Sequence, residues 1–476
     1  MPAPDLRSFL DELRLRGELV DVRVPVTPGG EISAVVKALE PEGAPGVFFH
    51  SVAGSAMPVV MGVFGKRSRI ANAMGVGADE ALDHVLALQA GALPAPVVVE
   101  AAPVHEIVFE GDNVDLATLP FAVHSRDDAG AYITSGVVMA RDPRTGSVNT
   151  GMYRMMITGR NTLTVNAAPD HDLGRIFAAA REKGEKVHIA IVIGHHPAYA
   201  IASQLKNPVA IDAHALTGAL LDRPLEVVRA RTVDLDVPAG AEIILEAVVD
   251  PGHRVDEGPF GEFSYYYGKA AAPVATITAI TRRSDAIFHD LHPTHAEHLC
   301  LWLFPGREAR LLEAVRRSVP GVTAVRIPFT GGSLSAYVSV KKRKDGDGKQ
   351  VILAAFTSDH FLKHVYVVDD DVSVFDDAQV LWSMNVRFQA DRDLVTLTNA
   401  KGIRMDPSAR QFTTPIGTDT ETSKLGFDAT RPLEGFPTRA DLPPHGFENL
   451  DVNSYLDDAA QLRVATSRAI RDTMVE

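Results

Sequence analysis

Many short segments with strand character lie between residues 105 and 300, and this run limits the folds open to the chain more than any other feature. The segments alternate apolar and polar residues or form short apolar runs, and both patterns are typical of β-strands. The clearest are AYITSGVVMA (131–140), KVHIAIVIG (186–194), AEIILEAVVD (241–250) and PVATITAIT (273–281). Only two or three short helices interrupt them, for example at 170–183. The run therefore predicts a β-rich central domain with a barrel-like sheet.

Both flanks of the central run show a different pattern, in which helices alternate with strands. In the first flank, residues 5–17 place Leu6, Phe9, Leu10 and Leu13 on one helical stripe, and further helices are expected at 31–39 and 69–92. A Pro/Ala-rich passage at 92–103 marks the exit from this part. Such alternation is typical of α/β domains. The sequence thus predicts a mixed fold with an N-terminal α/β domain (1–104), a central barrel-like domain (105–305) and a C-terminal α/β domain (306–476).

The C-terminal domain is expected to end in two unusual segments. Residues 402–445 are rich in Gly, Pro and Thr and show no periodicity. Such a long run without regular structure is usually either disordered or functional. A helix is predicted after it, at about 454–474.

Composition excludes several classes of function. The 476 residues are 46% hydrophobic, which is enough for two or three domains with real cores. The net charge of −14 and the lack of a basic patch argue against a nucleic-acid partner, and KKRKDGDGK (341–349) is interpreted as a surface turn. No apolar run reaches the roughly 18–20 residues of a membrane span, and the N-terminus has acids where a signal peptide needs an apolar run. Cys300 is the single cysteine, so we expect a cytoplasmic protein without an internal disulfide.

The segment DEGPFGEF (256–263) places two glutamates, Glu257 and Glu262, on either side of Gly-Pro-Phe-Gly. On a regular strand, residues five apart point to opposite faces. Pro259 and the two glycines prevent a regular ladder, so the segment must turn or bulge, and a bend can bring both carboxylates into one pocket. A glycosidase acid/base pair is one interpretation, although Trp302 and Trp382 are the only tryptophans available as sugar platforms. The alternative is a solvent-facing turn.

Three other motifs carry candidate chemistry. NTGMYR (149–154) places Arg154 at a strand in the β-rich domain, where it could bind a carboxylate or phosphate through two parallel hydrogen bonds, or lie on the surface. HPTHAEHLC (292–300) offers histidines for zinc, but its spacing fits no standard structural site, and its side chains could equally line a substrate pocket. DDD (369–371) suggests Mg²⁺ or, more commonly, helix capping.

Taken in order, these segments resemble the UbiD family of reversible decarboxylases, which includes 3-polyprenyl-4-hydroxybenzoate decarboxylase and ferulic acid decarboxylase. The resemblance covers nearly the whole chain. Its motifs are DLRSFLDELRLRGELVDV at the start, NTGMYR, EGPFGE, VVDDDV with VLWSMNVRFQADRD, and SKLGFDAT (423–430). It implies an N-terminal α/β domain, a central split β-barrel resembling flavin reductases, and a C-terminal α/β oligomerisation domain that supports a homodimer or hexamer.

The resemblance also implies a cofactor, prenylated FMN, which a separate flavin prenyltransferase supplies. A divalent cation, usually Mn²⁺, would bridge to the flavin phosphate, with K⁺ as a further cation. Asn149 and His171 match metal ligands, and Lys424 matches a lysine that pairs with the phosphate. The remaining positions that match cofactor contacts are Met152, Tyr153, Arg154, Asn166, Ala167, Ala168, Asp172, Ser203 and Leu205.

One position departs from the family pattern. The third metal ligand of the family is a glutamate, and the matching residue in DAHALTG (212–218) is Ala213, flanked by Asp212 and His214. Fewer protein ligands, a substituting neighbour or weak metal binding could each follow. A non-catalytic or weakly active flavin-binding relative is therefore the alternative to an enzyme.

The mechanism that the resemblance implies gives the two glutamates different roles. Arg154 would hold the substrate carboxylate and pair with Glu257, and Glu262 would protonate the carbon that has lost CO₂ through a covalent adduct with the flavin. The expected reaction is reversible, non-oxidative decarboxylation of an aromatic, heteroaromatic or α,β-unsaturated acid. A flavin oxidoreductase on a similar barrel is a third hypothesis, but no nicotinamide fingerprint is present. The sequence does not identify the substrate, although His295, His298, Leu299, Trp302 and Tyr265–Tyr267 are candidates for the pocket wall.

Overall fold

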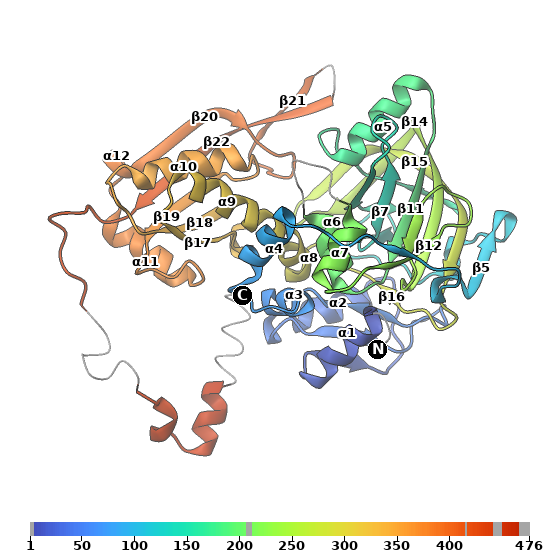
Figure 1. Cartoon of the computed structure of the whole chain (residues 1–476), viewed down its shortest axis with the longest axis horizontal. Helices are drawn as coiled ribbons and strands as arrows, with labels where there is room; N and C mark the ends of the chain where they lie inside the picture. Colours follow the sequence, from blue (N-terminus) through green and yellow to red (C-terminus); the bar gives the residue numbers. More distant parts are fainter. Residues whose placement is uncertain (1–3, 206–211, 415–416, 441–449, 466–476) are drawn as a thin grey trace.

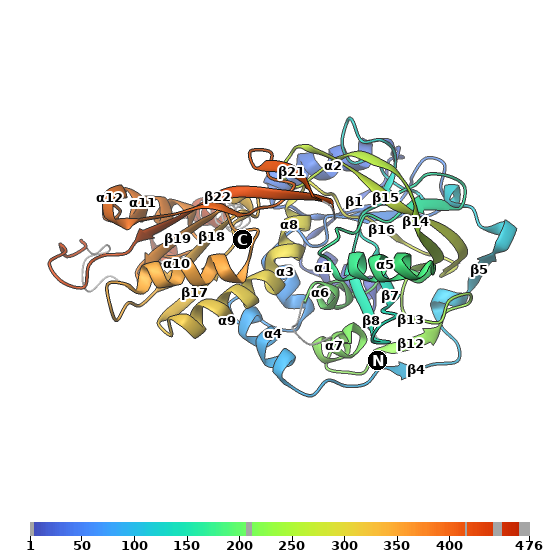
Figure 2. The ribbon, with the colours of Figure 1, turned by 90° about the horizontal axis from the view of Figure 1, so that it is seen from above.

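The fold is that of a computed structural model, which describes residues 4–205, 212–414, 417–440 and 450–465 (Figure 1). It is a mixed α/β structure in which three parts follow one another along the chain. Figures 1 and 2 both show helices between the central sheet and the C-terminal sheet. Within the described ranges, no helix is long and apolar enough to cross a lipid bilayer.

The N-terminal part is a small α/β unit whose elements match the predicted pattern. Its first helix buries the predicted stripe Leu6, Phe9, Leu10 and Leu13 and begins with a capping box between Asp5 and Ser8. The sheet has the order β1-β2-β3-β16, so its last strand comes from the far end of the central segment. The elements are α1 (Leu6–Leu15), β1 (Leu19–Val22), α2 (Glu31–Leu39), η1 (Glu40–Glu42), β2 (Gly46–Phe49), β3 (Val59–Met61), α3 (Arg67–Ala73), α4 (Ala81–Ala90) and β16 (Phe288–His289).

The central part is built on a large sheet with the order β10-β15-β14-β11-β7-β8 and with β5 on the outside of β15. Two long strands, β14 and β15, form its hairpin backbone. In the described residues no pairing joins β10 to β8, so the sheet is not a closed barrel. Its elements are β4 (Val97–Val98), η2 (Pro103–His105), β5 (Ile107–Glu110), η3 (Gly111–Asn113), η4 (Leu116–Thr118), β6 (Tyr132–Ile133), β7 (Val137–Arg141), β8 (Val148–Met152), β9 (Met155–Met156), β10 (Thr162–Thr164), α5 (Asp172–Lys183), β11 (Val187–Ile193), α6 (Pro197–Gln204), α7 (Ala213–Leu220), β12 (Glu226–Arg229), β13 (Asp236–Pro238), β14 (Ile243–Gly261) and β15 (Tyr267–Arg282).

The segment YRMMITGRNTLTV (153–165) forms only part of a hairpin. A turn closes between Thr158 and Thr162, and Ile157 bridges Leu163. Beyond that turn the two arms separate, because β9 pairs with β6 whereas β10 pairs with β15. Local alternation predicts strands, but it does not reveal that a distant strand competes for the same edge.

The C-terminal part is a second α/β unit, with the sheet order β17-β18-β19-β22-β20 and β21 paired to β22. Strands β18, β19 and β22 run parallel. The elements are α8 (Ala296–Trp302), η5 (Leu303–Arg307), α9 (Glu308–Ser318), β17 (Val322–Arg326), η6 (Phe329–Gly331), β18 (Ser335–Val340), α10 (Asp347–Ser358), β19 (His364–Asp369), α11 (Asp377–Arg387), α12 (Ala390–Asp393), β20 (Leu394–Lys401), β21 (Arg410–Thr414), β22 (Gly417–Ala429) and η7 (Val452–Tyr455).

The prediction of no regular structure over 402–445 was wrong for β21 and β22. Along β22 the buried positions alternate as a strand requires, but they are occupied by Thr420, Thr422, Lys424 and Asp428. Polar residues on the inner face remove the apolar alternation on which a strand prediction depends. The part of this range at 441–449, and the end of the predicted C-terminal helix at 466–476, lie outside the described residues; residues 458–465 are helical.

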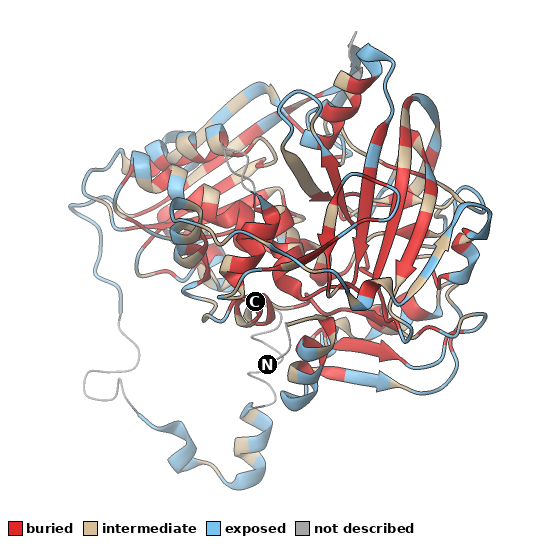
Figure 3. Cartoon of the chain, turned by 45° about the vertical axis from the view of Figure 1, so that its right-hand side comes forward, coloured by how far each residue is buried: buried red, intermediate tan, exposed pale blue. Residues whose placement is uncertain are grey.

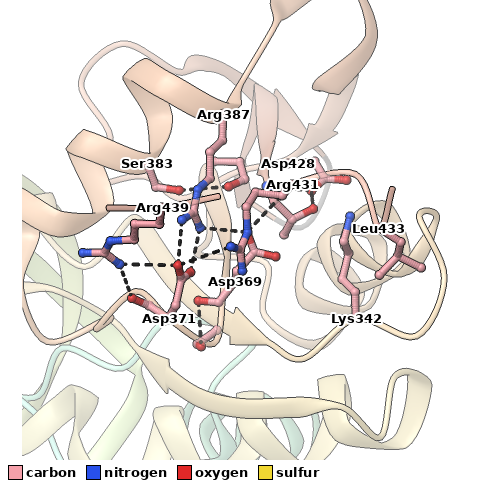
Figure 4. A network of polar contacts seen from close by, with 12 residues as sticks. Lys342, Asp369, Asp371, Ser383, Arg387, Asp428, Arg431, Leu433 and Arg439 are labelled. Atoms are coloured by element: carbon pink, nitrogen blue, oxygen red, sulfur yellow. Dashed lines mark hydrogen bonds and ion pairs between the residues drawn. The ribbon is translucent and has the colours of Figure 1, made fainter. Parts of the chain in front are cut away.

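Two of the three acids of DDD, Asp369 and Asp371, pair with arginines (Figure 4). Asp369 and Asp371 both accept from Arg387, Asp369 accepts from Arg431, and Asp371 accepts from Arg439. The Arg387 hydrogen bonds are the main cause that lowers the pKa of Asp371 to about 2. The network ties residues 431–440 to the C-terminal sheet. Asp369, Asp371, Arg431 and Arg439 also line a cavity of about 670 Å³, which none of the predicted catalytic or cofactor-binding residues lines.

The three parts share their interior. One buried cluster contains residues of α1, α6, α8 and the C-terminal sheet, and Figure 3 shows buried positions continuing from the central sheet into the neighbouring helices. An ion pair links the N-terminal and C-terminal parts, because Arg67 of α3 lies 2.7 Å from Glu308 of α9 and both side chains are buried. The three parts are thus packed against one another through a shared interior.

Buried histidines make the stability of this interior depend on pH. Burial lowers the pKa values of four of them to about 4, 3, 4 and 4: His195, His196, His289 and His295. Each is neutral when folded but has a pKa near 6.5 when unfolded, so below pH 6.5 the unfolded chain binds more protons. Burial also raises the pKa of Glu297 to about 8, which acts in the opposite direction, but through one group only.

We therefore expect the free energy of unfolding to fall as pH decreases from 6.5 towards 4, by about 1.4 kcal/mol per pH unit for each buried histidine. Urea unfolding at pH 7.5, 6.5 and 5.5 measures this, and exposed carboxylates remain ionised over that range. A midpoint that stays constant from pH 6.5 to 5.5 would contradict the prediction.

Candidate functional site

The site centres on Arg154, whose guanidinium lies between Glu257 and Glu262. Its Nε and Nη2 donate to the two oxygens of Glu257 at 3.0 and 2.9 Å, and its Nη1 donates to Glu262 Oε1. The side chain of Glu257 is fully buried, whereas Glu262 retains 15% exposure. Burial alone would lower the pKa of Arg154, but the charges of Glu262 and Glu257 raise it above the ordinary value. The structure thus brings together the three side chains that were predicted to meet.

A bulge near the end of β14 brings the two glutamates to one arginine. Glu257 pairs with Ala270 and Phe260 pairs with Gly268, so two residues of β14 face one residue of β15 at this point. Gly258 has a φ of 104°, and a Cβ there would lie 2.6 Å from the Gly268 carbonyl oxygen. Only glycine fits this backbone and this close approach.

Asn166, which was predicted only as a cofactor contact, belongs to the same network. Its Nδ2 donates to Glu257 Oε2, and its backbone N–H donates to the Arg154 carbonyl oxygen at 3.1 Å. Glu257 therefore accepts three hydrogen bonds, two of them from the charged guanidinium of Arg154. Its position fixes the direction of the Arg154 guanidinium.

Phe260 forms the floor of the site. The Arg154 guanidinium carbon lies 4.7 Å from the Phe260 ring centroid, and the Tyr132 ring lies 4.6 Å from the same ring on a tilted plane. Burial raises the pKa of Tyr132 above its ordinary value. An arginine stacked on an aromatic face keeps its planar fork in one orientation.

Gly268 leaves the space that the Glu262 carboxylate occupies. A Cβ on Gly268 would lie 2.5 Å from Glu262 Oε1, the oxygen that accepts from Arg154. We expect Gly268→Ala to push this flexible carboxylate aside and to lower kcat about tenfold or more, because a displacement of about 1 Å at a reacting group can reduce rates by about 10². Steady-state kinetics with a thermal melt measure the effect. Gly346→Ala, where a Cβ meets nothing within 4 Å, is the matched control; equal kcat in both variants would contradict the prediction.

Asn149 and His171, the predicted metal ligands, lie near Tyr153. Burial raises the pKa of Tyr153 to about 12, and Asn149 beside it acts in the opposite direction. No well-aligned hydrogen bond joins them, so Asn149 Nδ2 is buried without a partner in the described residues. The His171 ring centroid is 6.2 Å from that of Tyr153. An amide left unsatisfied inside the protein fits a group that the structure does not contain.

The other predicted cofactor contacts lie on the segments around this point. Ala168 accepts the His171 N–H at 3.0 Å, and its carbonyl oxygen would be 2.0 Å from a Cβ on Gly174, so this loop packs directly on α5. Met152 ends β8 and Ala167 packs against the central core. The Asp172 carboxylate accepts a hydrogen bond from Arg175 Nη1 at 3.0 Å.

The predicted contacts outside these segments already have partners. Ser203 donates to the Ala200 carbonyl oxygen, and Leu205 is buried at the end of α6. Lys424 donates to the carbonyl oxygens of His360 and Leu362 at 2.9 and 2.8 Å, and burial lowers its pKa to about 8. Lys401 of β20 lies 3.6 Å from Asp170, and this ion pair joins the C-terminal sheet to the loop that contains His171.

The two neighbours of Ala213 both have partners within the chain. Ala213 is the first residue of α7 and is buried. Asp212 caps this helix by accepting the His214 N–H, and His214 stacks on Tyr199 with Nε2 3.5 Å from the Tyr199 hydroxyl.

The histidine-rich segment 292–300 begins a helix. His295 caps α8 by accepting the Glu297 N–H, and His298 Nδ1 lies 2.8 Å from the Pro293 carbonyl oxygen. Among the described residues no three His, Cys, Asp or Glu side chains converge in a way that could hold a metal ion. His298 stacks on Trp302, and Phe263, the residue after Glu262, packs on both. These three rings lie next to the segment that carries Glu257 and Glu262.

Comparisons with known proteins match most of the chain. Three family models for 3-octaprenyl-4-hydroxybenzoate carboxy-lyase (UbiD) match in order: the N-terminal domain at 10–89, the Rift-related domain at 97–296 and the C-terminal domain at 302–429. The chain belongs to the UbiD family of prenylated-FMN-dependent decarboxylases, and it is a carboxy-lyase.

Named relatives span nearly the same length. Anhydromevalonate phosphate decarboxylase of Methanothermobacter thermautotrophicus is 34% identical over 430 residues, which is 90% of this chain and 97% of the relative. Phenolic acid decarboxylase of a Streptomyces species is 33% identical and covers 91% and 93%. The structure of the UbiD-class enzyme HmfF from Pelotomaculum thermopropionicum with FMN has a TM-score of 0.88 at 38% identity and covers 95% of this chain and all of that one. An evolved dimeric form of HmfF contains prFMN.

Proposed function

We propose that this chain catalyses the reversible, non-oxidative decarboxylation of an aromatic, heteroaromatic or α,β-unsaturated carboxylic acid. The observation that carries this proposal is Arg154 held between buried Glu257 and partly exposed Glu262. The relatives are named as decarboxylases of anhydromevalonate phosphate and of a phenolic acid, so the carboxyl group is what the named substrates share.

Arg154 binds the substrate carboxylate in this scheme. A guanidinium has five N–H groups, and Glu257 and Glu262 together use three of them. One N–H on each terminal nitrogen therefore remains, which matches the two oxygens of a carboxylate. Glu257 keeps the fork in place through its two hydrogen bonds with Arg154.

Glu262 holds and delivers the proton. When a substrate carboxylate shares Arg154 with Glu262, two negative groups lie side by side, and this favours a proton on one of them. After the C–C bond breaks and CO₂ leaves, Glu262 gives its proton to the carbon that carried the carboxylate. The glutamate then regains a proton from solvent, so atoms and charge balance over one turnover.

The residues around Tyr153 fit prenylated FMN, which when bound supplies an acceptor for the electron pair released with CO₂. Asn149, Met152, Tyr153, Arg154, Asn166, Ala167, Ala168, His171, Asp172, Ser203 and Leu205 would hold it within a split β-barrel, with Lys424 towards its phosphate. Unpartnered Asn149 Nδ2 supports this assignment. Asn149 and His171 would bind Mn²⁺ or a similar cation, with K⁺ as a further ion.

The wider proposal has four further elements. A flavin prenyltransferase supplies the cofactor, the domains divide at 104/105 and 305/306, the chain acts in the cytoplasm, and it assembles as a homodimer or hexamer. A weakly active or non-catalytic relative is the second candidate, because Ala213 stands where the family has its third metal ligand.

Coexpression with a flavin prenyltransferase tests the proposal. The purified protein should show the absorbance of a modified flavin and should release CO₂, or exchange hydrogen for deuterium, with members of a panel of aromatic and unsaturated acids. A protein that binds the cofactor but promotes neither reaction with any acid would favour the non-catalytic alternative.

A further inference from the structure

Residues 125–132 form a loop that lies directly on the peptide carrying Glu262. The Ala129 N–H donates to the Pro259 carbonyl oxygen at 2.8 Å, and the Tyr132 hydroxyl lies 3.4 Å from the same oxygen. A Cβ on Gly261 would be 2.3 Å from Ser125 Oγ, so no larger residue fits between the two segments. The segment between Glu257 and Glu262 is thus held in place directly before Glu262, the proposed proton donor.

Asp128 is the side chain that joins the two segments. Its Oδ1 accepts the Gly261 N–H at 2.8 Å, and its Oδ2 accepts the Ser125 N–H at 2.8 Å. The Asp128 N–H also donates to the Ser125 carbonyl oxygen at 3.1 Å, which closes a turn under the carboxylate. Hydrogen bonds from backbone N–H groups to an ionised acceptor are short and about twice as strong as neutral ones.

Asp128 contacts neither Arg154 nor Glu257 nor Glu262 through a hydrogen bond or ion pair in the described residues. Gly261, however, is the residue directly before Glu262, and its amide direction sets how the chain enters that residue. On the other side, the Glu262 N–H donates to the Tyr266 carbonyl oxygen at 3.0 Å, which closes the hairpin tip. The backbone on both sides of Glu262 determines where its side chain points. Fixing the Gly261 amide therefore fixes the backbone on one of these two sides.

We propose that Asp128 is a positioning residue for proton transfer, acting through the Gly261 amide to hold Glu262 against Arg154. The inference rests on the proposed role of Glu262 as proton donor. A bound substrate favours a proton on Glu262, and a protonated Glu262 is held less strongly by Arg154 because the ion pair between them is lost. At that stage Asp128 becomes the main restraint that keeps the donor within reach of the reacting carbon.

The test compares Asp128→Ala with Asp127→Ala in coexpressed, cofactor-loaded protein. Asp127 is the exposed neighbour; its backbone N–H contacts Tyr267, but its carboxylate makes no hydrogen bond or ion pair in the described structure. We expect Asp128→Ala to lower kcat per bound flavin by 10- to 100-fold, with KM changed by less than about threefold, because the lost geometry affects the chemical step and not substrate binding. Asp127→Ala should keep both parameters.

A double variant separates a positioning role from a merely structural one. If Asp128 acts through Glu262, then Asp128→Ala in a Glu262→Gln background should lower residual hydrogen–deuterium exchange by no more than about twofold. A further 10-fold loss in that background would overturn the inference. So would a kcat within threefold of the parent, or an effect confined to KM, in Asp128→Ala alone.

Two outcomes are kept distinct by the design. Full activity of Glu262→Gln alone would remove the proposed proton donor, whereas an inactive Glu262→Gln with a normal Asp128→Ala would remove only the positioning role. If Asp128→Ala does not fold, Asp128→Asn tests the same contact, since it keeps the size and one acceptor oxygen but loses the second. Its kcat should fall by about 3- to 10-fold, and an unchanged kcat would overturn the inference.

Discussion

Replacing Glu262 with glutamine should leave only a residual rate of decarboxylation while the protein still folds and binds flavin. Glutamine has the size of glutamate and can still accept from Arg154, so the ion-paired core of the site, Arg154 with buried Glu257, remains. It has no acidic proton to give to the carbon that loses CO₂. General acid catalysis contributes typically about 10²–10⁴-fold, and we expect kcat to fall within or beyond this range.

The measurement combines three signals from one preparation. Absorbance reports bound cofactor, a thermal melt reports the fold, and CO₂ release with deuterium incorporation into product reports turnover. Glu262→Asp is the matched control, because it keeps the carboxyl group on a shorter arm and should retain part of the activity. Turnover at the parent rate in Glu262→Gln would show that the proton comes from elsewhere.

Sequence reasoning anticipated the bend between the two glutamates because that feature is encoded locally, whereas their meeting with Arg154 was expected only from the family resemblance. A proline and two glycines between Glu257 and Glu262 exclude a regular strand, and the observed bulge aims both carboxylates at Arg154. The first helix was equally accessible, since its four buried residues repeat at helical spacing. Local periodicity and backbone restrictions are properties that a single sequence contains.

Other features depend on partners that are far away in the chain. Asn166 reaches Glu257 across 91 residues, and Asp128 reaches Gly261 across 133, and neither spacing has a sequence signature. Strand β22 was missed because its inner face is polar, with Lys424 satisfied by carbonyl oxygens of a separate loop. Tertiary hydrogen bonds, not local pattern, decide where such residues lie.

The interpretation of residues 341–349 shows the same limit on a smaller scale. KKRKDGDGK was predicted to be a surface turn, and its first part is one, but α10 begins inside it at Asp347. The Asp347 carboxylate accepts the N–H groups of Arg343 and Lys344 at 2.8 and 3.1 Å, which ties the turn to the start of the helix. Charges and glycines mark a turn well, but they hide a helix whose apolar residues lie further along the chain.

Arg154→Lys should reduce kcat/KM by at least about 10³-fold with little loss of fold. Lysine keeps one positive charge beside buried Glu257, but its compact ammonium cannot bond both oxygens of Glu257 in a fork while also facing Glu262 and a substrate carboxylate. The carboxylate would lose its paired donors and Glu262 would lose its fixed neighbour, so binding and proton transfer should weaken together.

Arg154→Ala separates this catalytic effect from stability. Removing the cation leaves Glu257 buried with Asn166 as its one hydrogen-bond partner among the described residues, and breaking a buried pair from one side destabilises by about 3–5 kcal/mol. We therefore expect Arg154→Ala to lower the urea midpoint clearly, and Arg154→Lys to lower it far less, although both variants are nearly inactive. If Arg154→Lys kept kcat/KM within tenfold of the parent, the two-pronged grip of the guanidinium would not be the source of catalysis, because a single point charge would then suffice.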